Sequence, residues 1–227
     1  CGAVAVAAWL RSARWWLVIH ALFAPLLVLA QQLALDPRWY LAAFIALALV
    51  YWSSFRTQVP LYLSNRATAR ALLELLPTDR PVSVLDLGSG TGSLLLPLAR
   101  ARADCSFTGI EAAPAPWLLS RLRARGLANL DLQRGDFFAA DWRGQDIVYA
   151  FLSPVPMARV WEKACDSLAP GALLVSNSFP VLGVRPEREI RLDDRRGTTL
   201  YLYRAVAAKS RQMHLRFGQR KRRRRAG

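Results

Sequence analysis

Val82-Ser83-Val84-Leu85-Asp86-Leu87-Gly88-Ser89-Gly90-Thr91-Gly92 is the stretch that decides the fold of this chain. A short apolar run ends at Asp86, a glycine-rich turn follows, and Ser93 to Leu96 is typical of the start of a helix. Glycine lets a backbone turn sharply and approach a ligand closely. The first turn of a helix offers unpaired N–H groups. A strand, a tight turn and a helix start, in this order, predict a site for a nucleotide-type ligand.

The spacing of the glycines separates this turn from a dinucleotide-binding loop. A dinucleotide fold uses G-x-G-x-x-G, whose third glycine would fall at Ser93. The pattern Asp-x-Gly-x-Gly-x-Gly that is present instead resembles motif I of the class I methyltransferases, which use S-adenosylmethionine (SAM). The resemblance implies that the loop passes under the methionine and ribose of SAM. The cofactor contacts that it implies here are Asp86, Gly88, Ser89, Gly90 and Gly92.

Two later strand ends carry further candidate contacts to the cofactor. Phe107 to Glu111 predicts a second strand that ends in an acid, and such an acid can accept hydrogen bonds from both ribose hydroxyls. Leu130 to Phe137 predicts the third strand and its exit. The resemblance implies that Asp136 bonds the adenine amino group and that the N–H of Phe137 meets the ring. A solvated glutamate and a simple Gly-Asp turn are the alternative interpretations.

The rest of the chain continues the alternation of strands and helices. Helices are expected over 66–76, 117–125 and 157–168, strands over 146–152 and 172–179, and a closing hairpin over 188–193 and 198–204. Residues 59–208 are therefore expected to form an α/β domain, a Rossmann-like seven-stranded sheet with helices on both faces. The cysteines at positions 1, 105 and 165 lack metal-ligand spacing, and no metal site is predicted.

The ends of the fourth and fifth predicted strands are where the methyl acceptor is expected, since ligands of open α/β sheets bind beyond the carboxyl ends of strands. Tyr149, Ser153 and Asn177 are the candidate acceptor-positioning residues. Attack on a sulfonium methyl needs no enzyme nucleophile, so catalysis would be mostly positioning. If the acceptor is a lysine, desolvation near Tyr149 and Phe151 would lower its pKa. No histidine stands at a strand end to serve as a base.

A narrower resemblance rests on segments beyond motif I. These are an apolar N-terminal region, a linker with Pro60, Gly109-Ile110-Glu111 followed by Pro116-Trp117-Leu118, and Ser176-Asn177-Ser178-Phe179-Pro180. Together they resemble the protein-lysine methyltransferases that modify the mitochondrial adenine nucleotide translocase and ATP synthase c subunit, and their bacterial relatives. The resemblance implies N-methylation of lysine in a membrane-associated protein. Thr91, where those enzymes usually carry an acid, leaves the substrate open, as do two extra residues after Glu111 and a second apolar segment.

The first 58 residues are expected to form a membrane region. Apolar runs over about 15–35 and 39–55 are near the length of a bilayer crossing, and Trp and Tyr gather at their ends. Arginines flank the outer ends of the pair, at positions 11, 14 and 56. This pattern predicts a transmembrane helical hairpin in a bacterial inner membrane, multi-pass, with the catalytic domain cytoplasmic. A buried helical hairpin packed on the domain, or a cleaved signal peptide, is the alternative.

The 227-residue chain carries a formal net charge of +15, and much of it is at the C-terminus. Nine Lys or Arg residues and no acid occur in residues 209–227, which are expected to be a disordered basic tail. Anionic lipid head groups are the expected partner of this tail, and RNA is the alternative. The rival functions are therefore methylation of a lipid, small molecule or RNA, and a non-catalytic SAM- or nucleic-acid-binding membrane protein.

Overall fold

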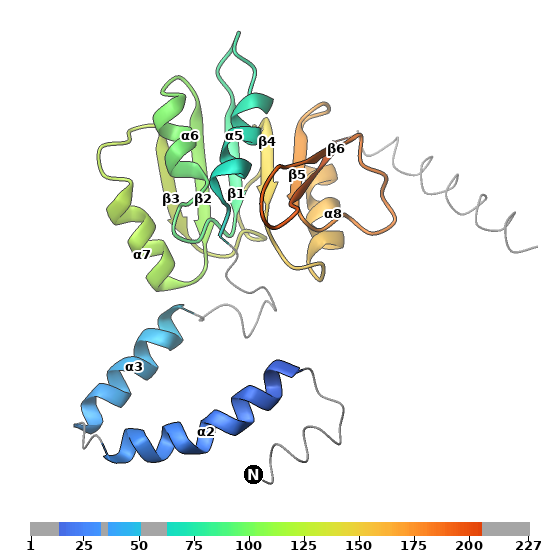
Figure 1. Cartoon of the computed structure of the whole chain (residues 1–227). Helices are drawn as coiled ribbons and strands as arrows, with labels where there is room; N and C mark the ends of the chain where they lie inside the picture. The colour runs from blue at the N-terminus through green and yellow to red at the C-terminus, as the bar shows by residue number, and fades with distance from the viewer. Residues whose placement is uncertain (1–13, 33–35, 51–62, 206–227) are drawn as a thin grey trace, which may run out of the picture. The chain divides into compact units, whose positions relative to one another are not determined.

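A computed structural model describes residues 14–32, 36–50 and 63–205 (Figure 1). The chain divides into two compact units, one ending at Leu47 and the other beginning at Ala48. The predicted basic tail over 209–227 and the linker over 59–62 lie outside the described residues. The domain boundaries expected at residues 58 and 208 also fall there.

The N-terminal unit contains the helices α2 (Arg14–Gln32) and α3 (Pro37–Val50). Asp36 caps the start of α3, since its carboxylate accepts the N–H of Arg38 at 2.9 Å and Pro37 opens the helix. The Tyr40 hydroxyl donates to the carbonyl of Ala30 at 2.7 Å and holds α3 to α2.

The prediction of transmembrane helices over 15–35 and 39–55 is not supported. Within the described ranges, no helix combines the length and the apolar character that a bilayer crossing requires. α3 has 14 residues, which at 1.5 Å per residue extend about 21 Å, against about 30 Å of hydrocarbon. α2 has 19 residues, contains Pro25 and ends in two glutamines. Residues 33–35 and 51–55 lie outside the described part.

A seven-stranded sheet forms the centre of the second unit, in the order β3-β2-β1-β4-β5-β7-β6 (Figure 1). The strands are β1 (Ser83–Leu87), β2 (Ser106–Glu111), β3 (Leu130–Arg134), β4 (Ile147–Ala150), β5 (Leu173–Asn177), β6 (Arg188–Arg191) and β7 (Thr199–Arg204). β1 to β5 are parallel, and β7 runs antiparallel to both β5 and β6. The predicted seven-stranded sheet with its closing hairpin is confirmed.

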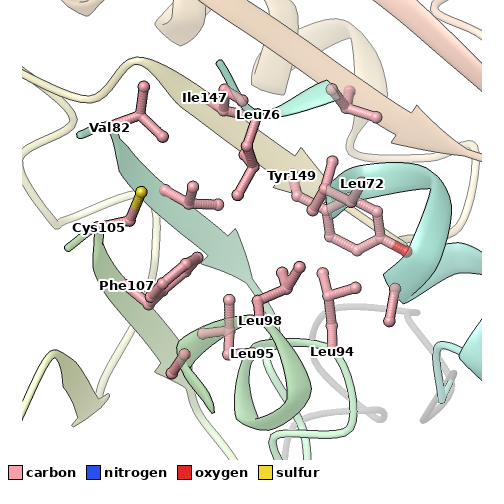
Figure 2. Packing of buried hydrophobic residues seen from close by; sticks show 14 of the residues in the cluster. Leu72, Leu76, Val82, Leu94, Leu95, Leu98, Cys105, Phe107, Ile147 and Tyr149 are labelled. Atoms are coloured by element: carbon pink, nitrogen blue, oxygen red, sulfur yellow. The ribbon is translucent and has the colours of Figure 1, made fainter. Parts of the chain in front are cut away.

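Helices cover both faces of this sheet, as expected. They are α5 (Arg66–Leu75), α6 (Leu95–Ala101), α7 (Pro114–Arg123) and α8 (Met157–Ser167). One apolar cluster joins α5 and α6 to the sheet through Leu72, Leu95 and Phe107, and Figure 2 shows the ring of Tyr149 inside it. A second cluster joins α8 to the opposite face and contains Trp142. The strand order reverses between β1 and β4, which is where open α/β sheets bind their ligands.

Candidate active site

The glycine loop after β1 has the backbone that its sequence predicts. Gly88, Gly90 and Gly92 all have positive φ angles, of 76°, 54° and 74°. A side chain rarely tolerates this left-handed region. A Cβ added to Gly92 would also lie 3.2 Å from Leu96. α6 begins at Leu95 rather than at Ser93, because residues 91–94 are still in turns.

Glu111, at the end of β2, forms a hydrogen bond to this loop. Its Oε2 accepts the N–H of Gly90 at 2.8 Å, and its Oε1 accepts the N–H of Ala113 at 2.7 Å. The side chain is buried. A carboxylate has about four lone-pair sites, so acceptor capacity remains for a ribose. Glu111, which is expected to bind the ribose, therefore also fixes the glycine loop by hydrogen bonds. The sequence alone did not indicate these bonds.

Gly109 is a site residue that sequence reasoning missed. It lies in the middle of β2 and pairs with Asp86 in the sheet register. A Cβ built on Gly109 would lie 2.8 Å from side-chain atoms of Leu132, Leu95 and Ser89. Glycine inside a strand often marks such a close approach, and this signal was present in the sequence. Gly109 lets the glycine loop settle on the sheet.

The carboxyl group of Asp86 is buried, which is unfavourable for its charged form. It is 3% exposed, and no hydrogen bond from the described part of the chain reaches its side chain. Burial, and next the negative charge of Glu111, raise the pKa of Asp86 to about 8. A positively charged group bound next to it would lower that pKa and stabilise the carboxylate. The site is therefore suited to a cationic ligand.

Two buried hydroxyl groups at the same edge have no partner in the described structure. They are the Oγ of Ser89 in the glycine loop and the Oγ of Ser153 just after β4. An unsatisfied buried polar atom costs about 1–3 kcal/mol. Such atoms are common where a ligand completes the hydrogen bonding.

A hydrogen-bonded group joins the two predicted acceptor residues Tyr149 and Asn177. The Asn177 amide donates to the Tyr149 hydroxyl at 2.7 Å, and the Oγ of Ser64 lies 2.8 Å from the same hydroxyl. Tyr149 and Asn177 are both buried. Burial raises the pKa of Tyr149. Ser64 is the residue of this group that the sequence did not reveal.

The turn between β6 and β7 holds the start of α5 against this group. Asn65, the N-cap of α5, accepts the N–H of Thr68 at 2.9 Å and donates to Asp194 at 2.5 Å. Asp194 also accepts the hydroxyl of Thr198 at 2.6 Å, and Arg196 donates to the carbonyl of Leu63 at 3.1 Å. The pKa of Asp194 is lowered to about 2, and hydrogen bonds from Thr198 are the main cause. Ser64 is thereby fixed next to Tyr149.

Asp136 and Phe137 follow β3 at the same edge of the sheet. Arg134, the last residue of β3, pairs with Glu111, and the N–H of Gly135 donates to the Glu111 carbonyl at 3.1 Å. Asp136 is exposed, and its Oδ1 accepts the N–H of Phe138 at 2.8 Å. One carboxylate oxygen therefore serves a local turn. The other oxygen faces no described donor, and the adenine role of Asp136 and Phe137 stays a prediction.

Comparisons with known proteins agree on the class of enzyme. A family model described as the ANTKMT methyltransferase domain matches residues 86–188. An RNA methyltransferase from Salinibacter ruber, solved with S-adenosyl-L-homocysteine, superposes with a TM-score of 0.56 at 27% identity, covering 63% of this chain and 93% of that chain. The chain is a class I SAM-dependent methyltransferase. SAM is its cofactor.

Two curated methyltransferases show how far the similarity extends. A protein-lysine N-methyltransferase of Saccharolobus islandicus is 26% identical over 160 residues, which are 66% of this chain and 96% of the relative. The release factor glutamine methyltransferase of Escherichia coli is 33% identical over 96 residues, 40% of this chain. That stretch spans about a third of the Escherichia coli enzyme, 34% of its length.

The residues of this methyltransferase fit SAM at the β1/β4 switch point. SAM carries a sulfonium and an ammonium group, and the buried Asp86 lacks a cationic partner among the described residues. The loop with Gly88, Gly90 and Gly92 brings backbone close to a ligand, and the orphaned Ser89 hydroxyl lies in that loop. Of the acceptor candidates, the structure joins Tyr149 to Asn177 and shows no contact from either to Ser153.

Proposed function

We propose that this methyltransferase transfers a methyl group from SAM to the side-chain amine of a lysine in a membrane-associated protein. The observation that carries the proposal is the neutral Tyr149–Asn177–Ser64 group beside Asp86, in which Tyr149 and Asn177 are buried. The group itself carries no charge, so it would hold an amine by hydrogen bonds and not by an ion pair. The similarity to a protein-lysine N-methyltransferase over 96% of that relative's length supports the same acceptor.

The residues of the site would act by holding an uncharged amine in line with the cofactor. When bound, SAM supplies a methyl group activated by the sulfonium charge, and sulfur keeps the bonding electron pair as the acceptor nitrogen attacks. The raised pKa of Tyr149 keeps its hydroxyl protonated at neutral pH, so this residue positions the amine and is not a base. Desolvation at the buried edge lowers the pKa of the lysine. The unpartnered Ser153 oxygen is available to accept a hydrogen bond from the amine.

A lipid bilayer is the second partner in this proposal. α2 and α3 expose large apolar side chains, among them Phe23, Trp39 and Phe44, and α3 has no buried residue. Apolar surface of this extent on a soluble monomer is rare and marks an interaction site. The basic tail over 209–227 would add attraction to anionic head groups. A chain cut after Ala208 should keep protein methylation but bind anionic vesicles less strongly.

RNA is the second candidate acceptor. It is favoured by the net charge of +15 and by the Salinibacter ruber neighbour, which is described as an RNA methyltransferase. A lipid or small-molecule acceptor, and a SAM-sensing role without transfer, remain rival proposals from the sequence. One experiment separates all of them.

The test measures transfer of labelled methyl from SAM into host membranes and extracts that lack the gene. Purified wild-type protein is compared with its Asp86→Asn variant, and protein, lipid and RNA fractions are counted separately. The proposal expects label in one protein band, absent with the variant. Label in the RNA or lipid fraction would replace the lysine proposal with that acceptor. SAM binding with no label in any fraction would favour the sensing role.

A further inference from the structure

The helix α7 carries leucines on the side that points away from the sheet. Pro116 and Ser120 are its buried residues and mark the inward side. At 100° per residue, Leu118 and Leu122 lie on the opposite side, one turn apart. They are 54% and 46% exposed, and the neighbouring Leu119 is 46% exposed. A surface helix normally places polar residues there, so this leucine ridge is unusual.

Positive charge lies beside the leucine ridge. By the same helical geometry, Arg121 lies next to the ridge, Arg123 lies closer to the side of Pro116 and Ser120, and Arg125 follows the end of the helix. No Asp or Glu occurs between Ala112 and Leu130. None of the three arginines forms an ion pair with a carboxylate of the described residues. The exposed side of α7 is therefore apolar, and the charged residues of this segment are all basic.

Two of these arginines, Arg121 and Arg123, make contacts with the body of the domain. Arg121 donates to the carbonyl of Leu132 at 3.4 Å, and its guanidinium lies 5.8 Å from the centre of the Trp117 ring. Arg123 donates to the carbonyl of Thr91 at 3.0 Å, in the glycine loop. Carbonyl and ring contacts leave the positive charges unneutralised. The hydrogen bond from Arg123 to Thr91 also joins α7 directly to the glycine loop.

We propose that the outward face of α7 docks on an anionic lipid bilayer. Leucines on such a helix enter the boundary between head groups and acyl chains, while flanking arginines contact lipid phosphates. The charge pattern favours this partner, because Arg121 lies beside the leucines that would enter the bilayer and no acid of this segment would repel an anionic surface. The inference does not depend on which acceptor is methylated. It places the glycine-loop side of the sheet toward the membrane.

The test is a polarity-sensitive fluorophore attached to Leu122→Cys in the full chain, with Leu182→Cys as the matched control. Leu182 is 77% exposed and lies in the loop between β5 and β6, away from α7. Both variants also carry Cys1→Ser, since Cys105 and Cys165 are buried. With phosphatidylcholine vesicles containing phosphatidylglycerol, the label at position 122 should shift to shorter wavelength, and the label at 182 should not. Pure phosphatidylcholine should give a much smaller shift.

Two results would overturn the proposal. One is an unchanged emission at position 122 while the protein sediments with the vesicles, because another segment would then hold the membrane. The other is an apolar emission at position 122 already in buffer, because another part of the chain or a second copy would then cover the face. As a second measurement, the pair Leu118→Ser and Leu122→Ser should weaken sedimentation with anionic vesicles several-fold relative to Leu182→Ser. Equal binding by the two would contradict the proposal, and circular dichroism would verify that both variants fold.

Discussion

Asp86 and Tyr149 occupy paired positions on the adjacent strands β1 and β4, and both are buried. The negative charge of Asp86 adds to the burial that raises the pKa of Tyr149. Neither side chain has a cationic partner among the described residues. A carboxyl group and a phenol that both resist ionisation thus meet at the switch point of the sheet. The pair favours a cationic ligand nearby, which agrees with SAM as the cofactor.

Replacing Asp86 by Asn should change how stability depends on pH. The folded-state pKa of about 8 is above the ordinary value of 3.8 for an aspartate, so the folded protein binds this proton more tightly than the unfolded chain does. The free energy of unfolding of the wild type should therefore fall as pH rises from about 4 to 8. Each pKa unit is worth about 1.4 kcal/mol, so the loss is on the order of several kcal/mol. Asp86→Asn should lack this loss.

Urea unfolding of the SAM-free proteins at pH 5 and pH 8 measures this difference. Equal changes in the wild type and in Asp86→Asn would contradict the raised pKa. The variant should also bind SAM at least tenfold more weakly in calorimetry, because it cannot offer a negative charge to the cofactor.

Gly92→Ala should weaken SAM binding, and Gly144→Ala is its matched control. Both glycines have a positive φ, of 74° and 76°. A Cβ at Gly92 would press on Leu96, whereas one at Gly144 would meet nothing within 4 Å. The left-handed backbone should cost each variant about 1–2 kcal/mol of stability. Only Gly92→Ala should lose SAM affinity, and an equal loss in both would argue that the loop does not contact SAM.

Tyr149→Phe should lower methyl transfer without weakening SAM binding. The change removes the hydroxyl that meets Asn177 and Ser64, so the acceptor would be held less well. We expect kcat/KM for the acceptor to fall about tenfold or more, roughly 1.4 kcal/mol. The shape of the pH profile should stay the same, because Tyr149 is not a base. A pH profile that loses one limb would contradict the positioning role.

Tyr203→Phe is the control for loss of a buried tyrosine hydroxyl. The Tyr203 hydroxyl accepts the N–H of Val181 at 2.8 Å, away from the β1/β4 switch point. Its removal leaves a buried donor unpaired and should cost about 1–3 kcal/mol of stability. Methyl transfer at a temperature where both variants are folded should be normal for Tyr203→Phe. A similar loss of transfer in both would indicate a general effect of destabilisation.

Asp194→Ala should loosen the start of α5 and thereby disturb Ser64. The carboxylate of Asp194 accepts hydrogen bonds from Asn65 and from both the N–H and the hydroxyl of Thr198. We expect a stability loss of about 1–3 kcal/mol. Hydrogen exchange should increase in the first turn of α5 and not in α8. Unchanged protection of α5 would show that the β6–β7 turn does not hold this helix.

Local patterns were sufficient to predict the glycine loop and the sheet that carries it. The glycine loop, Glu111 and the seven-stranded order follow from short motifs and from strand-helix alternation, because each depends on residues close together in the chain. The Tyr149–Ser64 contact joins residues 85 positions apart, and only the fold reveals it. The hydrogen bonds of Glu111 to Gly90 and Ala113 were also hidden, because the sequence does not show which N–H groups a carboxylate will meet.

At the N-terminal segment, composition predicted more than the described structure supports. A continuous apolar run predicted spanning helices, and no helix of the described ranges has the length and apolar character for a crossing. α7 shows the opposite case. The burial of Pro116 and Ser120 reveals that Leu118 and Leu122 lie on its exposed side, which the sequence alone did not indicate.

The most direct test of lysine methylation is mass spectrometry of the protein that this enzyme labels. The labelled band from membranes would be digested and its peptides sequenced after reaction with the wild-type enzyme and with Asp86→Asn. The account predicts methyl groups on the side-chain nitrogen of one lysine, present only with the wild type. Methyl groups on glutamine, on a carboxylate or on no protein residue at all would contradict it.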